Sequence, residues 1–184
     1  MKKIFVLGIP LLLLLIASCQ IQRTGKPESS GKTVKIIRHS ALPIQFNAEA
    51  RFKETQRFLV ILNRYRKQKG LTPFKVDKKL QRAAQWMSDD MAAGDYLSHH
   101  DSKGRDPFER QAAFGYNYNT DRAENVAAGQ KSAESVFKAW QSSGGHNRNM
   151  LDPHFRAVGI GFSYNRESRY GWYWATAFGG QESR

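Results

Sequence analysis

The sequence predicts a domain of the α+β class, because two hydrophobic periods follow one another along the chain. Apolar residues recur at helical spacing in several segments between residues 58 and 140. From residue 158 onwards they alternate with small or polar residues, which is the pattern of strands. Helices followed by a hairpin favour an architecture in which helices and sheet occupy separate layers.

Two longer helices are predicted first. One ends at Gly70, with Pro73 beyond it, and the next begins after the capping residue Asp77 and ends at Gly94. Each presents one apolar face, formed by Phe58, Ile61, Leu62 and Tyr65 in the first helix and by Leu80, Ala83, Ala84, Met87 and Met91 in the second.

Two shorter helices and a hairpin follow. A helix start is indicated at Asp106, a capping carboxylate that precedes Pro107 in the first turn and Glu109 at the third position, and this helix runs to Gly115. Ser132 opens another helix, whose inward residues are Ala133, Val136, Phe137 and Trp140.

The last part of the chain predicts a β-hairpin around a loop at residues 165–169. One side of its two strands carries mostly large residues, namely Val158, Ile160, Phe162, Trp172, Trp174, Thr176 and Phe178. The other side carries Gly159, Gly161, Ser163, Tyr173, Ala175 and Ala177.

Residues 1–18 have the features of a lipoprotein signal peptide. Basic residues precede an apolar run at residues 4–16, which is shorter than the about 20 residues that span a bilayer. Small residues then lead directly to Cys19. We expect Cys19 to carry acyl chains such as palmitate and to anchor the mature chain in a membrane, the outer one where a bacterium has two. The alternatives are an inert buried cysteine or an uncleaved anchor.

Residues 19–50 are expected to form a tether and N-terminal extension, and residues 51–180 the domain. Residues 20–33 are polar and contain Gly, Pro and Ser, as flexible linkers do, whereas residues 34–46 have the character of a strand-like extension. Cys19 is the only cysteine, so the chain cannot form an internal disulfide.

The charge of the chain is strongly positive and unevenly distributed. The formal net charge is +13, and residues 51–82 hold eleven Lys or Arg against Glu54 and Asp77. A basic face favours anionic lipid, a cell-wall polymer or nucleic acid as a partner, while the plain alternative is a solvated helix surface. The sequence contains no helix-turn-helix, zinc-finger or RNP pattern, which argues against nucleic acid.

Three short phrases supply the candidate chemistry. Each contains a His or Glu among small or turn-forming residues, and they are Leu97-Ser98-His99-His100-Asp101, Ala123-Glu124-Asn125-Val126-Ala127-Ala128-Gly129 and Ser143-Gly144-Gly145-His146-Asn147-Arg148-Asn149-Met150-Leu151. Two imidazoles and a carboxylate can share a cleft, hold a divalent cation or exchange protons.

In their order and spacing these phrases resemble the bacterial form of the CAP superfamily (cysteine-rich secretory proteins, antigen 5, pathogenesis-related proteins). Further matching phrases bring the resemblance to the span from about Phe58 to Gly179. The resemblance implies a three-layer α-β-α sandwich around a central, mainly antiparallel sheet. It also implies that His99, Glu124 and His146 line a central cleft that can hold a divalent metal such as zinc.

One departure from the animal members bears on that cleft, because Ser143 stands where they carry a second glutamate. The loss of a carboxylate favours zinc or a proton over a hard cation. By its position, Ser143 is counted among the predicted ligand-binding residues, with His99, Glu124 and His146. A nucleophile pair of Ser143 and His146 would need hydrogen-bond contact and a third orienting group, and the sequence shows neither. His100 is expected to point away from His99, since adjacent side chains diverge in extended chain.

The sequence therefore predicts a lipoprotein of the cell envelope that acts as a binding module for an envelope lipid or wall ligand. The alternative is a metal-dependent hydrolase of envelope peptide or glycan, in which Glu124, His99 or His146 would activate a metal-bound water. Only one carboxylate is placed, which argues against a two-carboxylate glycosidase and favours binding without turnover. A third hypothesis is a structural protein that links membrane to cell wall through its basic face.

Overall fold

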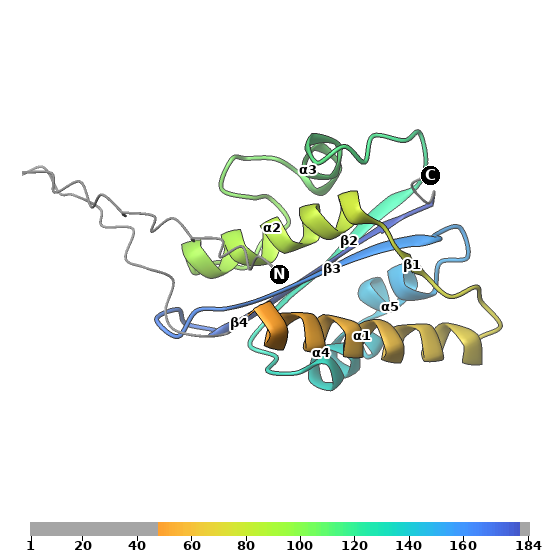
Figure 1. The fold of residues 1–184 in the computed structure, drawn as a ribbon, viewed down its shortest axis with the longest axis horizontal. Helices are drawn as coiled ribbons and strands as arrows, with labels where there is room; N and C mark the ends of the chain where they lie inside the picture. Colours follow the sequence, from red (N-terminus) through yellow and green to blue (C-terminus); the bar gives the residue numbers. More distant parts are fainter. Residues whose placement is uncertain (1–47, 181–184) are drawn as a thin grey trace, which may run out of the picture. The chain divides into compact units, whose positions relative to one another are not determined.

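The computed structural model describes residues 48–180 (Figure 1). The predicted signal peptide, Cys19 and residues 19–47 of the predicted extension lie outside the described residues, whereas its last three residues begin α1. The elements follow in the order α1 (Ala48–Gln68), β1 (Lys75–Val76), α2 (Lys78–Gly94), α3 (Pro107–Ala113), β2 (Arg122–Ala128), α4 (Ala133–Gln141), α5 (Gly144–Leu151), β3 (Ala157–Tyr164) and β4 (Trp172–Gly179). Within residues 48–180, no helix is both long enough and apolar enough to cross a membrane.

The four strands of the described part form one mixed sheet in the order β1-β3-β4-β2. The short β1 pairs in parallel with β3, and the other two pairings are antiparallel. The predicted hairpin is confirmed as β3 and β4, paired from Ala157 opposite Gly179 to Tyr164 opposite Trp172. The sheet is thus mainly antiparallel, as the resemblance implied.

Helices cover both faces of the sheet, which confirms the predicted α+β class and its three layers. Helix α2 packs on β3 and β4, with α3 beside α2 and β2, while α1, α4 and α5 lie on the opposite side (Figure 1). Large and small side chains alternate along the hairpin strands, so the two faces of the sheet contribute to two separate hydrophobic cores. Large side chains such as Val158, Phe162 and Trp174 pack toward α1 and α4, and small ones such as Ala175 and Ala177 pack toward α2.

Small residues on β3 allow α2 to approach the sheet closely. A Cβ atom added to Gly159 would lie 2.1 Å from the carbonyl carbon of Leu80, and one added to Gly161 would lie 2.1 Å from the carbonyl oxygen of Ala84. Such distances are far inside van der Waals contact. The two glycines on the predicted strand therefore let the backbone of α2 rest directly on the backbone of β3.

The helix boundaries follow the capping chemistry that the sequence shows. Asp77 accepts hydrogen bonds from the backbone of Lys79 and Leu80 at the start of α2. Asp106 and Glu109 form the predicted capping box of α3, and Ser132 caps α4. Strands β1 and β2 and helix α5 were not predicted from the sequence. Helix α5 begins with two glycines and buries only Met150, so neither helix propensity nor an apolar face predicts it from the sequence.

Candidate functional site

Two of the three predicted cleft residues are in direct contact. Glu124 lies on β2 opposite Ala177 of β4, and its side chain is 2% exposed. His99 lies in the loop after α2 with its side chain 50% exposed. The Nδ1 atom of His99 is 2.9 Å from Oε1 of Glu124. The sheet thus supplies a buried carboxylate, and the loop presents an imidazole over it.

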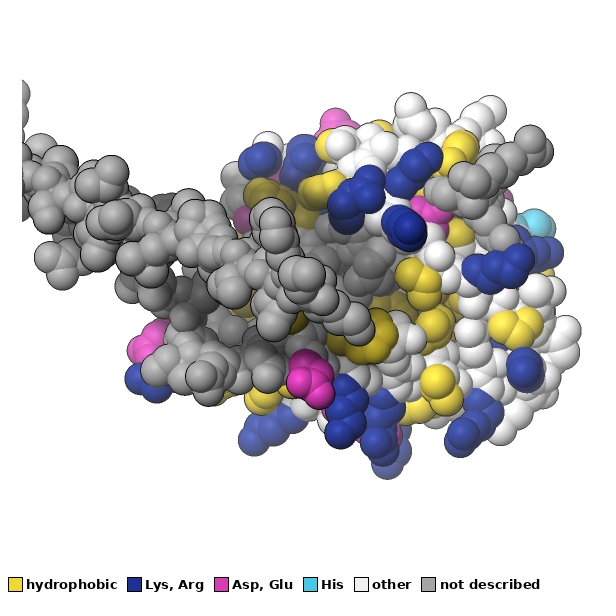
Figure 2. Space-filling view, in the orientation of Figure 1, with side chains coloured by type: hydrophobic (Ala, Val, Ile, Leu, Met, Phe, Trp, Pro, Cys, Tyr) yellow, Lys and Arg dark blue, Asp and Glu magenta, His cyan; other side chains and the backbone are white. Residues whose placement is uncertain are grey.

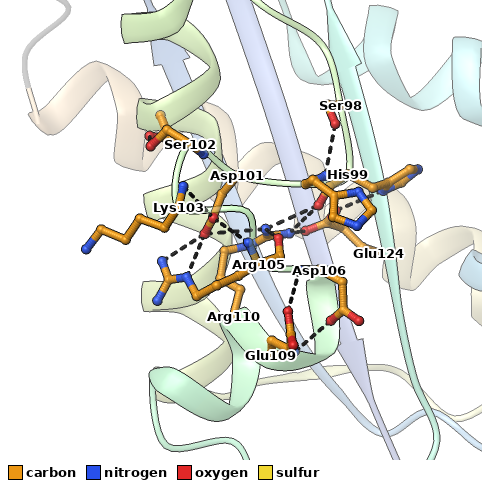
Figure 3. Close-up of polar contacts among 12 residues, drawn as sticks. Ser98, His99, Asp101, Ser102, Lys103, Arg105, Asp106, Glu109, Arg110 and Glu124 are labelled. Carbon is orange, nitrogen blue, oxygen red and sulfur yellow. Dashed lines mark hydrogen bonds and ion pairs between the residues drawn. The ribbon is translucent and has the colours of Figure 1, made fainter.

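The second carboxylate oxygen of Glu124 is held by an arginine. Nη2 of Arg110, on α3, donates to Oε2 of Glu124, and the Arg110 side chain is 1% exposed (Figure 3). The same guanidinium donates to the backbone oxygens of His99, at 3.2 and 3.3 Å, and of Arg105, at 3.3 Å. Arg110 therefore fixes both the carboxylate of Glu124 and the main chain of His99.

A second ion pair completes this network. Oδ2 of Asp101 accepts from Nε of Arg105 at 2.8 Å and lies 3.7 Å from Nη1 of Arg110. Burial alone would raise the pKa of Asp101, but hydrogen bonds from the side chain and backbone of Arg105 and from the backbone of Lys103 hold that pKa below its usual value. With Glu124, the network contains two buried carboxylates and two guanidiniums, so its formal charges balance.

His146 lies on α5, where its Nδ1 atom is 2.9 Å from Oγ of Ser143. Burial lowers the pKa of His146, and the charge of His99 lowers it further. The second effect indicates that the two imidazoles share one electrostatic environment, although no hydrogen bond is seen between them in the described part. The neutral form of His146 is therefore favoured at neutral pH.

Two asparagines tie β2 to α5. Asn125 is fully buried and donates to the backbone oxygen of His146 at 3.1 Å. Asn149 donates to the backbone oxygen of Glu124 at 3.3 Å and to the side chain of Asn125 at 2.9 Å. These contacts hold the strand that carries Glu124 against the helix that carries His146.

The other histidines of the described part lie away from this cluster. His100 is exposed, and its backbone N–H donates to Oγ of Ser98 at 2.9 Å. His154 is exposed and its ring contacts Asp152 at 3.0 Å. Of the two histidines in the first phrase, His99 is the one whose ring contacts Glu124.

The arrangement does not fit a three-ligand metal centre. Among residues 48–180, no group of three or more His, Asp or Glu side chains lies close enough to hold a metal ion. Both carboxylate oxygens of Glu124 are also engaged, one by His99 and the other by the guanidinium of Arg110. A metal at Glu124 would therefore have to share these oxygens with both contacts, since each carboxylate oxygen has two lone pairs.

The contact between Ser143 and His146 supplies one requirement of a nucleophile pair that the sequence did not show. The second requirement is a group that orients the imidazole from its other side. Within the described residues, no carboxylate hydrogen-bonds the ring of His146. Ser143 is the N-cap residue of α5, and the contact therefore links two side chains of the first helical turn.

Sequence reasoning missed the importance of Asp101, Arg105 and Arg110. The only available signal was their place in a loop and a short capped helix next to His99. Charged residues in such positions are usually solvated, and the burial of Asp101 and Arg110 appears only in the folded structure, where α3 packs on β2.

Comparison with known proteins gives concordant results. The family model described as the cysteine-rich secretory protein family, CAP, matches residues 59–178. The uncharacterized protein YkwD of Bacillus subtilis is 38% identical over 102 residues, which are 55% of this chain and 39% of that protein. The chain therefore spans well under half the length of this relative.

Solved structures show the same fold at low sequence identity. An extracellular protein with an SCP domain from Bacillus anthracis aligns with a TM-score of 0.63 at 21% identity, over 71% of this chain and 41% of that one. An outer surface protein from Borrelia burgdorferi aligns with a TM-score of 0.64 at 17% identity, over 71% of this chain and 94% of that one. These descriptions are consistent with a secreted or envelope location.

Proposed function

Because the chain belongs to the cysteine-rich secretory protein family, the CAP family, we propose that it is a binding module anchored in the cell envelope. Its partner would be an anionic envelope surface, and the cleft around His99 and Glu124 would take up a polar group of that surface. The proposal is supported by the resemblance of residues 1–19 to a lipoprotein signal and by the location of the described relatives.

The observation that carries the binding role is the engaged state of Glu124. Its charge is balanced by Arg110, and its other oxygen contacts His99, so it is not poised as a free general base. His99 meets Glu124 through Nδ1, so its Nε2 edge points away from the carboxylate, on a side chain that is 50% exposed. An imidazole held in this way can donate to or accept from a ligand.

The exposed face of α1 supports an anionic surface as the partner. Lys53, Arg64 and Lys67 are exposed on this helix, together with two apolar side chains, Phe52 at 64% and Val60 at 57%. Figure 2 shows Lys and Arg side chains along the surface over α1. Cations flanking exposed apolar side chains on one helix are typical of contact with a lipid surface. One part of the predicted basic face is wrong, however, because Arg66 is fully buried.

Binding of the chain from residue 20 onwards to vesicles should depend on charge. We expect retention on phosphatidylglycerol-containing vesicles but not on pure phosphatidylcholine, and a steep fall as salt rises, because the screening length is about 8 Å at physiological ionic strength. Arg64→Gln with Lys67→Gln should weaken binding about tenfold or more, since each cation near an anionic surface contributes about 1 kcal/mol. Vesicle co-sedimentation measures this.

The matched control is Arg166→Gln, which removes a cation in the β3–β4 loop that is paired with Glu167. Its binding should equal that of the wild type. A parallel arm uses purified cell wall, on which His99→Ala should reduce retention while His100→Ala should not. Salt-independent binding, or no binding to either probe at low salt, would refute the proposal.

The hydrolase alternative has one observation in its favour, the contact between Ser143 and His146. We expect no turnover of envelope peptides or glycans by the purified chain, and any trace activity should persist in Glu124→Gln. Removal of a general base typically costs on the order of 100-fold or more in rate. Activity that disappears in Glu124→Gln, with the fold retained by circular dichroism, would favour the hydrolase.

Anchoring depends on a residue outside the described part. Cys19→Ala is expected to release the protein from membranes or to block its processing, because the lipid chains supply about 0.8 kcal/mol per buried methylene. Cell fractionation with immunoblotting measures both effects. A variant that is processed and stays membrane-bound like the parent would contradict a lipid anchor at this position.

A further inference from the structure

A cation already contacts the carboxylate that the resemblance assigns to a divalent metal. The guanidinium of Arg110 contacts Oε2 of Glu124 inside the protein, with the Arg110 side chain 1% exposed and the Glu124 side chain 2% exposed. We propose that Arg110 is the resident cation of the cleft and that it excludes a divalent metal from Glu124. The cleft would then bind its ligand as a metal-free site.

The charges of the network support this inference. Glu124 and Asp101 are balanced by Arg110 and Arg105, so the buried cluster needs no further positive charge. A dication at Glu124 would lie beside a guanidinium, and like charges at short range in a poorly solvated site repel strongly. The guanidinium is a permanent cation in proteins, so this repulsion would persist.

The geometry prevents Arg110 from simply moving aside. Its Nη1 and Nη2 atoms also donate to the backbone oxygens of His99 and Arg105. Displacing the guanidinium would leave these carbonyls without that partner inside the protein, which costs free energy. It would also free the main chain of His99, which the resemblance implies as a second metal ligand beside Glu124.

The position of Arg110 is set by the helix that carries it. Asp106 and Glu109 form the capping box that starts α3, and the N–H of Arg110 donates to the backbone oxygen of Asp106 at 3.0 Å. Helix α3 contacts both α2 and β2, which places Arg110 between the loop of His99 and the strand of Glu124 (Figure 3). Arg110 is therefore a positioning residue, held by its own helix as well as by the ion pair.

Zinc titration of the chain from residue 20 onwards, followed by calorimetry, tests the inference. The zinc affinity of the wild type should be unchanged in Glu124→Gln, because any zinc it takes up binds elsewhere. Arg110→Met should bind zinc at least tenfold more tightly than the wild type, through Glu124 and the adjacent His99 as two protein ligands, since Glu124 is then a buried carboxylate without a cation. The gain should disappear in Arg110→Met with Glu124→Gln.

Arg105→Gln is the matched control, because it removes one positive charge from the same network without freeing Glu124. It should gain no zinc site. If Arg110→Met does not fold, the zinc affinities of wild type and Glu124→Gln still test whether Glu124 binds zinc in the wild type. The inference is overturned if wild-type affinity falls tenfold or more in Glu124→Gln, or if folded Arg110→Met gains no zinc affinity. Either result leaves the vesicle and cell-wall experiments untouched, so the two proposals fail separately.

Discussion

Replacement of Arg66 by Met is expected to lower the free energy of unfolding by about 3 kcal/mol or more, since each buried group left without its hydrogen bond costs about 1–3 kcal/mol. Arg66 is fully buried at the end of α1. Its guanidinium donates to four backbone oxygens at 2.8 to 3.3 Å, those of Thr72, Met150, Asp152 and Phe155. This one side chain therefore joins α1 to the segment between α5 and β3.

Within residues 48–180, the charge of Arg66 is held without an ion pair to a carboxylate, because its guanidinium donates to backbone oxygens. Burial, with a smaller contribution from the charge of Arg156 and against that of Asp152, lowers the pKa of Arg66 to about 10, so the group stays protonated at neutral pH. The ring of Phe74 lies 3.9 Å from the guanidinium carbon and contributes a cation–π contact. Carbonyl dipoles and an aromatic face thus replace water around the cation.

Two variants make this prediction specific to the buried guanidinium. Arg66→Lys keeps the charge but loses the planar fork of donors, so an intermediate loss is expected. Arg64→Met changes an exposed neighbour on the same helix and should shift stability by no more than about 0.5 kcal/mol. Urea unfolding at pH 7 measures all three. A loss in Arg66→Met no larger than that in Arg64→Met would contradict the prediction.

Arg66 also shows where prediction from sequence ended. The spacing of apolar and small residues predicted α2 and the hairpin, because side chains on one face repeat with the helical period in α2 and at every second residue in the strands. A buried cation has no such period. Between Tyr65 and Lys67, Arg66 looks like part of a basic helix surface, and only the docking of the α5–β3 segment buries it.

The candidate site divides in the same way. The presence of His99 and Glu124 in one cleft could be predicted, because the phrases around them resemble a known family in order and spacing. The partner of Glu124 on its other oxygen could not, since Arg110 reaches it only through the packing of α3 on β2. Contacts between segments distant in sequence carry the charge balance of this cleft, and that balance decides whether a metal fits.

Asp101→Asn is expected to cost about 3 kcal/mol at neutral pH, because removing one partner of a buried ion pair typically costs about 3–5 kcal/mol. The Asp101 side chain is fully buried. It accepts from the backbone of Lys103 and Arg105 at 3.0 Å and from the side chain of Arg105 at 2.8 Å. Asparagine would keep the shape but leave the two guanidiniums of the network facing one carboxylate instead of two.

The pH dependence of this loss follows from the lowered pKa of Asp101 in the folded state. Ionised Asp101 stabilises the wild type above its unfolded pKa of about 3.9, and the contribution is lost as the pH falls through the lower folded value. The difference in unfolding free energy between wild type and Asp101→Asn should therefore be largest at neutral pH and should shrink below about pH 4. Urea unfolding at pH 7 and pH 3 measures it.

Asp106→Asn is the control, since asparagine caps a helix as well as aspartate does, and little change is expected at either pH. An Asp101→Asn effect that matches this control, or that does not shrink in acid, would show that the buried carboxylate contributes nothing through its charge.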